Sequence, residues 1–367
     1  MADTTWPHTP WFLNADSPLT YPGGQFSREQ LETAARELTR LYPLNVAYQL
    51  LNDDADFLVT PLLIAGFAWH LAPKILLGLD LAAADPWTAA PDLVERLRIG
   101  PEYHGARFEL EVWAQLHRAG MSVEYAPEGR LGGADLRVRH RDRVYRLELK
   151  LGRAPDVDRF IHAFIQGFMD SLTWYHFEHP TSPNGECIEM APAIRKRLFE
   201  RGGLEELIAR REEILEGMVS AYQKWHSEGA APGSHPIGEF AIVHRPGCTP
   251  GAFSVSFGVE TSPEKAAARA LRNVRKATRQ VTPDGTGVVV VDVERNTDPE
   301  VFVSRLQSEA LARPSDFARV QFVIVRTHAR LEDGCLATHG AVVPLLGYTM
   351  RREDRELAGA VFKATSS

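Results

Sequence analysis

The chain has 367 residues, a formal net charge of -7 and 44% hydrophobic residues. This apolar share is enough for a full core, which excludes a disordered or fibrous chain, and the acidic balance argues against coating of nucleic acid through bulk charge. The three cysteines, Cys187, Cys248 and Cys335, are far apart and form no CxxC pair, so we expect neither a disulfide framework nor a structural zinc site.

The N-terminal residues lack the basic and apolar regions of a signal peptide, which predicts a cytoplasmic protein. The most apolar stretch, 57–79, is interrupted by Pro61, His70, Pro73 and Lys74. No uninterrupted part of it reaches the roughly 20 residues that a membrane span needs. We interpret it as two buried helices broken near Pro73, and we expect no membrane partner.

Residues 1–100 are predicted to form an N-terminal helical region. Ser27 precedes a run in which Leu31, Ala34, Leu38 and Leu41 recur at helical spacing, which is typical of an N-cap followed by an amphipathic helix. A helix over 106–119 is expected to end at Gly120, and two alternating strands follow over 134–139 and 144–151. Residues 156–180 and 204–225 are predicted to be helical, and 181–193 a loop.

The second half of the chain alternates between strand and helix patterns. Short strands are expected over 239–244 and 252–258, and Ser262-Pro263-Glu264 opens a helix that runs to about Gln280. The continuous apolar runs at 288–293 and 321–325 predict buried strands, with a helix over 299–312 between them. This order favours an α/β core.

One carboxylate stands out in the helix over 106–119. At 100° per residue, Glu109 falls in the apolar sector of Val112 and Leu116, whereas Glu111 falls on the opposite side. A carboxylate in an apolar stripe is costly unless it is paired or holds a cation. Glu109 is therefore a candidate site residue, the alternative being an acid at the edge of the stripe that reaches water.

The two strands that follow carry three more candidates, Asp135, Glu148 and Lys150. Alternation places Glu148 and Lys150 on one face of their strand. A hairpin centred between Arg141 and Asp142 makes Asp135 and Glu148 direct cross-strand neighbours.

Two acids that face each other repel, so one must be protonated, an arginine must bridge them, or a divalent cation must lie between them. Mg²⁺ prefers oxygen ligands in octahedral geometry and keeps several waters, which two or three carboxylates suit. An ammonium at Lys150 can orient a water and offset charge that develops on a phosphate.

The pattern Gly105-x-x-Phe108-Glu109, then Gly133-Ala134-Asp135, then Glu148-Leu149-Lys150 resembles the PD-(D/E)XK nuclease superfamily of restriction-endonuclease-like and Holliday-resolvase-like enzymes. The resemblance implies Asp135 and Glu148 as principal ligands of Mg²⁺ or Mn²⁺ and Glu109 as a further ligand. Lys150 would assist the attacking water. Ala134 stands where the family has proline.

The fold that this resemblance implies is α/β, a mixed central β-sheet flanked by helices (a restriction-endonuclease-like core), here with an N-terminal helical region. The interval from Lys150 to the helix at 264 is long. We therefore expect region 1–100, core parts 101–180 and 238–367, and a helical insertion over 181–237. Alternatively, the helix over 156–175 takes the position that follows the motif.

Basic residues suggest a phosphate-binding surface although the whole chain is acidic. One face of the helix from Ser262 to Gln280 carries Lys265, Arg269, Arg272, Lys276 and Arg279. A second cluster surrounds the expected hairpin: Arg130, Arg137, Arg139, Arg141, Arg143, Arg146 and Arg153. The alternative for the helix is a solvated face with acids nearby.

These patterns together predict a magnesium-dependent endonuclease that hydrolyses DNA. Two alternatives stay open. One is an inactive module of nuclease fold that binds nucleic acid or a protein, and the other is a metal-dependent enzyme that acts on RNA or a small phosphorylated substrate. A homodimer is also left open.

Overall fold

The computed structural model divides the chain into two compact units, Met1–Arg153 with Pro263–Ser367, and Ala154–Ser262. The residues that it describes are 20–21, 24–43, 68–98, 100–125, 134–151, 160, 164, 167–168, 171–172, 175–176, 178–179, 186–190, 202–229, 233–237, 240–245, 253–257, 263–283, 285–293, 297, 299–330 and 336–362.

The first unit is built on a six-stranded mixed sheet of order β12-β11-β10-β5-β4-β3. Its strands are β3 (Ser122–Tyr125), β4 (Leu136–His140), β5 (Arg143–Leu151), β10 (Thr286–Val293), β11 (Phe322–Arg330) and β12 (Leu336–Pro344). β10 runs parallel to both β5 and β11, while the other pairs are antiparallel. The prediction of an α/β fold with a mixed sheet is confirmed.

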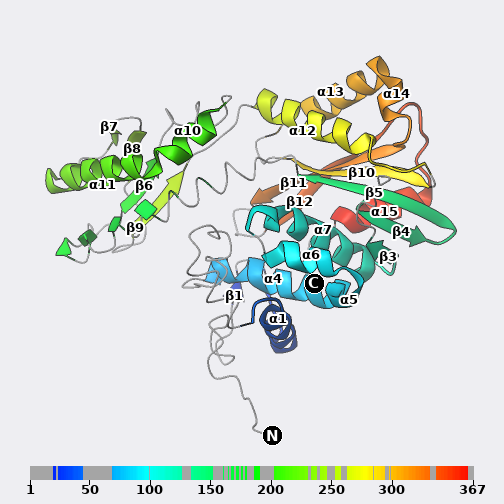
Figure 1. Ribbon diagram of the computed structural model, residues 1–367, viewed down its shortest axis with the longest axis horizontal. Coiled ribbons are helices and arrows are strands. Elements are labelled where there is room, and N and C mark those ends of the chain that lie inside the picture. Colours follow the sequence, from blue (N-terminus) through cyan, green and yellow to red (C-terminus); the bar gives the residue numbers. More distant parts are fainter. Residues whose placement is uncertain are drawn as a thin grey trace, which may run out of the picture. The chain divides into compact units, whose positions relative to one another are not determined.

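Helices cover both faces of this sheet (Figure 1). On one face, Val288 and Val290 of β10 share a core with α7 (Gly100–Arg118) and α15 (Arg352–Phe362). On the other face, Val289 and Val291 pack in a second core with α12 (Pro263–Thr278), α13 (Pro299–Ala312) and α14 (Pro314–Phe317). Successive residues of a strand point to opposite faces, so the continuous apolar run of β10 fills both cores.

An N-terminal group of helices packs beside α7. The helices are α1 (Arg28–Leu41), α4 (Ala68–Ala84), α5 (Pro86–Ala89) and α6 (Pro91–Arg98), and the short strands β1 (Thr20–Tyr21) and β2 (Gly24–Gln25) precede them. The cap predicted at Ser27 is confirmed: its hydroxyl accepts from the Gln30 amide at 3.2 Å, and the Gln30 side chain accepts from the Ser27 amide. The fully buried Asp80 joins α4 to α7 through ion pairs with Arg107 and Arg118, both at 2.7 Å.

The predicted break near Pro73 is wrong, because α4 continues through Pro73 to Ala84. Proline removes one hydrogen bond to the carbonyl four residues earlier, but here this loss falls near the described start of the helix. The remaining turns keep their bonds and bury Leu77 and Leu81. Among the described residues, no helix has the length and apolar character that crossing a membrane requires.

Gly120 ends α7 as predicted. It has φ +78°, in the left-handed region that glycine adopts without steric cost. The amides of Gly120 and Met121 turn back to the carbonyls of His117 and Leu116, so the chain reverses directly into β3.

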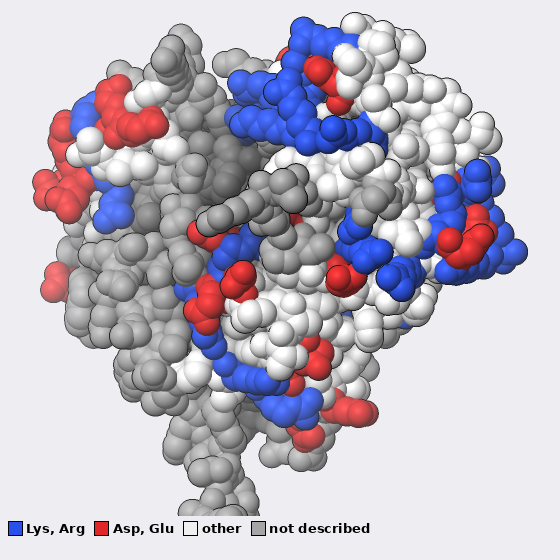
Figure 2. Space-filling view, turned by 45° about the vertical axis from the view of Figure 1, so that its right-hand side comes forward, with Lys and Arg blue, Asp and Glu red and all other residues white. Residues whose placement is uncertain are grey.

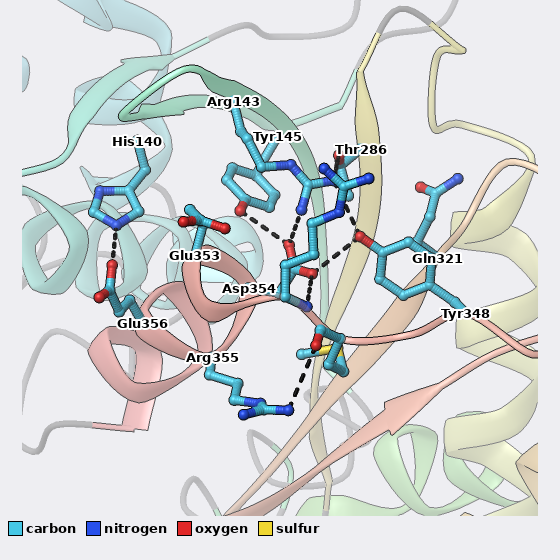
Figure 3. A network of polar contacts seen from close by, with 12 residues as sticks. His140, Arg143, Tyr145, Thr286, Gln321, Tyr348, Glu353, Asp354, Arg355 and Glu356 are labelled. Atoms are coloured by element: carbon cyan, nitrogen blue, oxygen red, sulfur yellow. Dashed lines mark hydrogen bonds and ion pairs between the residues drawn. The ribbon is translucent and has the colours of Figure 1, made fainter.

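A buried carboxylate, Asp354, fixes the β4–β5 hairpin to α15 (Figure 3). Its two oxygens accept hydrogen bonds from Arg143 at 2.6 Å, from Tyr145 and Tyr348 at 3.0 Å each, and from the Arg351 amide at 2.7 Å. These donors come from β5, from the segment after β12 and from the start of α15. Asp354 thereby joins elements that are far apart in the sequence.

The second unit differs from the predicted helical insertion over 181–237. It contains the helices α10 (Gly203–Ala209) and α11 (Arg211–Ser227) and a four-stranded sheet of order β7-β8-β6-β9. The strands are β6 (Glu186–Met190), β7 (Gly233–Ile237), β8 (Phe240–Arg245) and β9 (Phe253–Phe257). The predicted loop over 181–193 therefore contains a strand, which pairs with both β8 and β9. Those two strands belong to this unit and not to the core.

Candidate active site

Glu148 and Lys150 lie side by side on β5 as the alternation predicts. Leu147 and Leu149 point into the α7-side core, and Glu148 pairs in register with Val289 of the α12-side core. The Glu148 side chain is fully buried, and Lys150 Nζ lies 2.5 Å from its Oε1. The Lys150 side chain is partly exposed. A ligand can therefore contact its ammonium group while the carboxylate of Glu148 stays buried.

The predicted hairpin register is confirmed. A two-residue turn at Arg141-Asp142 joins β4 to β5, and the last pair of the ladder is Leu136 with Leu147. Arg141 takes φ +55° to close this turn. Asp135 directly precedes β4, at the point where the ladder ends.

Asp135 turns its carboxylate toward β5. Its Oδ2 accepts a hydrogen bond of 2.7 Å from the amide of Leu149, the nitrogen of the peptide bond that follows Glu148. The carboxylate oxygen thus accepts the hydrogen bond that a backbone carbonyl would accept if the ladder continued beyond Leu136. This contact holds Asp135 beside the Glu148–Lys150 pair.

The charges that act on Asp135 include those of two other predicted site residues, Glu109 and Lys150. Burial, and after it the negative charge of Glu109, raise the pKa of Asp135 to about 6. The cation of Lys150, the Leu149 amide and the cation of Arg96 oppose this rise in the pKa. A carboxyl group whose pKa is raised by burial and a second acid is typical of a site prepared for a cation.

Glu109 is buried in α7 as predicted, but it is already paired. Arg96 of α6 donates a hydrogen bond to each carboxylate oxygen of Glu109, from Nη1 to Oε1 at 3.0 Å and from Nη2 to Oε2. The Tyr125 hydroxyl of β3 donates to the same Oε2 at 3.2 Å. The burial of Arg96 opposes its charge, but the hydrogen bond and charge of Glu109 outweigh this effect and raise the pKa of Arg96.

Sequence reasoning missed Arg96 and Tyr125. Arg96 follows Leu93 by three residues in α6, where Leu93 and Leu97 are fully buried. A cation beside such an apolar stripe is the same signal that marked Glu109. The sequence could not show which acid would meet it.

Glu111 is also more involved than its predicted position on the opposite side of α7 suggests. It forms an ion pair with Arg326 of β11, whose side chain is fully buried and lies over the Phe108 ring at 5.2 Å. Arg326 lies in a run of apolar strand residues, so pairing stabilises a charge that would otherwise be costly to bury. This pair ties α7 to the sheet.

The donors present suit a hard cation such as Mg²⁺. Among the residues that the structure describes, no three His, Cys, Asp or Glu side chains lie close enough together to hold a metal ion. Mg²⁺ needs only one or two protein carboxylates when waters and substrate phosphates complete its octahedron. Asp135 and Glu148 are the two carboxylates that could hold such an ion, whereas Glu109 is held by Arg96.

The basic face predicted on α12 is present. Arg272, Lys276 and Arg279 are exposed and make no ion pair within the described part of the chain. Arg269 is half-buried on the same side, and the side chain of Lys265 lies outside the described residues. Figure 2 shows Lys and Arg side chains gathered at the top of the view, where α12 lies in Figure 1.

α12 also touches the strand that carries the candidate site. Asn273 donates a hydrogen bond of 2.7 Å to the carbonyl of Leu151, the residue after Lys150. The opposite side of α12 buries Ala267, Ala270 and Val274 against the sheet. This packing fixes the basic face relative to β5.

The hairpin cluster is largely neutralised, contrary to the expectation that it forms one phosphate-binding surface. Arg141 pairs with Glu353 and Glu356 at 3.4 and 2.8 Å, and Arg143 pairs with Asp354. Arg137 lies 3.4 Å from Glu124. Arg139 is exposed and makes no ion pair among the described residues. Arg130 and Arg153 lie outside the described residues.

Comparisons of this chain with family models, with curated proteins and with solved structures find no match.

Proposed function

We propose that this chain is a metal-dependent nuclease that hydrolyses phosphodiester bonds of DNA at Asp135, Glu148 and Lys150. The observation that carries the proposal is the position of the Asp135 carboxylate on the Leu149 amide. That contact sets one acid beside a second acid, Glu148, which is already paired with an ammonium. An α/β sheet that presents these groups agrees with the resemblance to the PD-(D/E)XK superfamily.

In this proposal Asp135 and Glu148 hold Mg²⁺ or Mn²⁺, and Glu109 is a further ligand. Such an ion makes a water more acidic and polarises phosphoryl oxygens. Lys150 orients the attacking water and offsets the negative charge that develops on the phosphate. Its partial exposure beside the buried Glu148 suits a group that must meet both water and substrate.

The basic α12 face (Arg269, Arg272, Lys276 and Arg279) binds the phosphate backbone in this proposal. Arg272, Lys276 and Arg279 are exposed and have no acid partner among the described residues, so bound phosphates would relieve their mutual repulsion. The Asn273 contact with Leu151 places this face next to the end of β5. A net charge of -7 confines such attraction to a local surface.

A second candidate is an inactive module of the same fold that binds nucleic acid or a protein partner. One observation favours it: both carboxylate oxygens of Glu109 are already engaged, by Arg96 and Tyr125. This candidate predicts binding that ignores chelators and survives the loss of Glu148.

The test is a cleavage assay on single-stranded DNA, double-stranded DNA and RNA with Mg²⁺, Mn²⁺ or EDTA. We expect DNA cleavage with either ion and none with EDTA, and Lys150→Ala should slow it at least about a hundredfold. The matched control is Lys224→Ala, an exposed lysine of α11, which should cleave at the wild-type rate. Cleavage that persists in EDTA, or is unchanged in Lys150→Ala, would refute the proposal. Cleavage of RNA alone would reassign the substrate.

A further inference from the structure

The pairing of Glu109 has a geometry that a simple surface ion pair lacks. Both carboxylate oxygens are engaged, one by Arg96 Nη1 and the other by Arg96 Nη2 and Tyr125. Arg96 Nη2 also donates to the Tyr125 hydroxyl at 3.0 Å, which closes a three-membered polar network. Tyr125 is itself held by stacking on Trp113, with ring centroids 5.8 Å apart.

This network lies at the candidate metal site and not at a remote corner of the fold. Tyr125 of the network pairs in register with Leu136, the residue that follows Asp135. Arg96 comes from α6, Glu109 from α7 and Tyr125 from β3, so three elements converge beside the start of β4.

Glu109 and Arg96 differ in how far their side chains are exposed to solvent, and therefore in how readily each can take a new partner. The Glu109 side chain is 10% exposed, whereas the Arg96 side chain is 29% exposed. A cation that binds Glu109 must displace charge-assisted hydrogen bonds, the stronger class of hydrogen bond. The displaced guanidinium then needs another anion, and its planar donors match a phosphate as well as they match a carboxylate.

We propose that Arg96 and Tyr125 form a latch that keeps Glu109 from the metal until a substrate phosphate replaces Glu109 as the partner of Arg96. This inference rests on the proposed function, because it assigns an order to events at the same site. Metal and substrate then bind cooperatively: phosphate draws Arg96 away, and the released Glu109 completes the ligand set. Arg96 acts as a positioning residue in this account.

The first test measures Mn²⁺ affinity by calorimetry in the absence of nucleic acid. Arg96→Gln should bind Mn²⁺ about tenfold more tightly than the wild type, because Glu109 no longer gives up two charge-assisted hydrogen bonds. Tyr125→Phe keeps the stack on Trp113 and should tighten binding about twofold. A purely structural role for Arg96 predicts the opposite sign, since a loosened site binds metal more weakly.

Two controls assign the effect to Glu109. Arg98→Gln removes the other α6 arginine, whose side chain is 26% exposed and pairs with Glu95, and it should keep wild-type affinity. The double variant Arg96→Gln/Glu109→Gln should lose the gain. Wild-type or weaker Mn²⁺ affinity in a folded Arg96→Gln variant overturns the inference.

The second test measures coupling. A DNA duplex should raise the Ca²⁺ affinity of the wild type at least about fivefold more than that of Arg96→Gln, because coupling between two ligands is reciprocal and depends on the latch. Equal coupling in both proteins overturns the inference. If the wild type cleaves DNA with Mg²⁺ while Arg96→Gln leaves Mn²⁺ affinity unchanged, the latch fails and the proposed function stands. If neither protein binds Mn²⁺ at millimolar concentration, both fail.

Discussion

The basic α12 face and the hairpin cluster (Arg137, Arg139, Arg141 and Arg143) contain the same kind of residue and look alike in the sequence, yet their surroundings differ. On α12, the exposed Arg272, Lys276 and Arg279 make no ion pair with the described residues. At the hairpin, Glu353, Asp354 and Glu356 of α15 neutralise two of the arginines. A cluster of cations therefore indicates a phosphate-binding surface only when the fold leaves its charge uncompensated.

The difference follows from which elements pack beside each cluster. α15 begins with acids in its first turn, where carboxylates are stabilised by the helix dipole, and it packs at the end of the hairpin (Figure 3). On α12, the ion pairs fall on Arg275, which lies 3.3 Å from Glu309 and 3.8 Å from Asp316, and not on the exposed Arg272, Lys276 and Arg279 of the described residues. The hairpin cluster thus serves mainly the fold, while the α12 face can serve a ligand.

The largest effect that would sharpen this comparison is on stability. Asp354→Ala should lower the free energy of unfolding by about 3 kcal/mol, because it leaves Arg143, Tyr145 and Tyr348 without their buried acceptor. Urea denaturation followed by tryptophan fluorescence measures this loss.

Asp354→Asn is the matched control, since it keeps an acceptor but removes the charge. It should fall between Asp354→Ala and the wild type. A loss below about 1 kcal/mol in Asp354→Ala would mean that the pairing of the hairpin arginines with α15 contributes little to stability. The claim that the hairpin cluster serves mainly the fold would then be wrong.

The next effect is on nucleic-acid binding. Arg272→Ala/Lys276→Ala should weaken binding of a DNA duplex roughly 10- to 100-fold near 0.1 M salt and reduce the slope of log affinity against log salt by about 2. Stability should change by less than about 0.5 kcal/mol, because both side chains are exposed. Fluorescence anisotropy over a salt series measures both quantities. An unchanged salt slope would remove α12 from the DNA-binding surface.

The smallest effect is expected at the hairpin. Arg141→Ala should change DNA affinity by no more than about twofold, because Glu353 and Glu356 already compensate this cation. The same anisotropy series measures it, with the α12 double variant for comparison. A loss as large as that of the double variant would show that the two clusters act alike and would end the distinction.

The part of the site that depends on local periodicity could be predicted from the sequence. Alternation along β5 set Glu148 and Lys150 on one face, and the two-residue turn fixed the register that brings Asp135 beside them. Both depend on neighbours within 20 residues of chain, for which strand period and turn length are sufficient constraints.

The partners that are set by packing between separate elements could not be predicted. Glu109 meets Arg96 across the contact of α6 with α7, and Glu111 meets Arg326 more than 200 residues away. The four-stranded sheet of the second unit was missed for the same reason. β6 is short, and its pairing with β8 and β9 is set by tertiary contacts.

The measurement that tests the central claim most directly is single-turnover cleavage of DNA by Glu148→Gln in Mg²⁺, beside the wild type. The substitution keeps the size of this fully buried side chain and removes only the charge that would hold the ion and pair with Lys150. We predict a loss of about a thousandfold in rate, with the folded structure retained. A rate within tenfold of the wild type would contradict a nuclease site at Glu148.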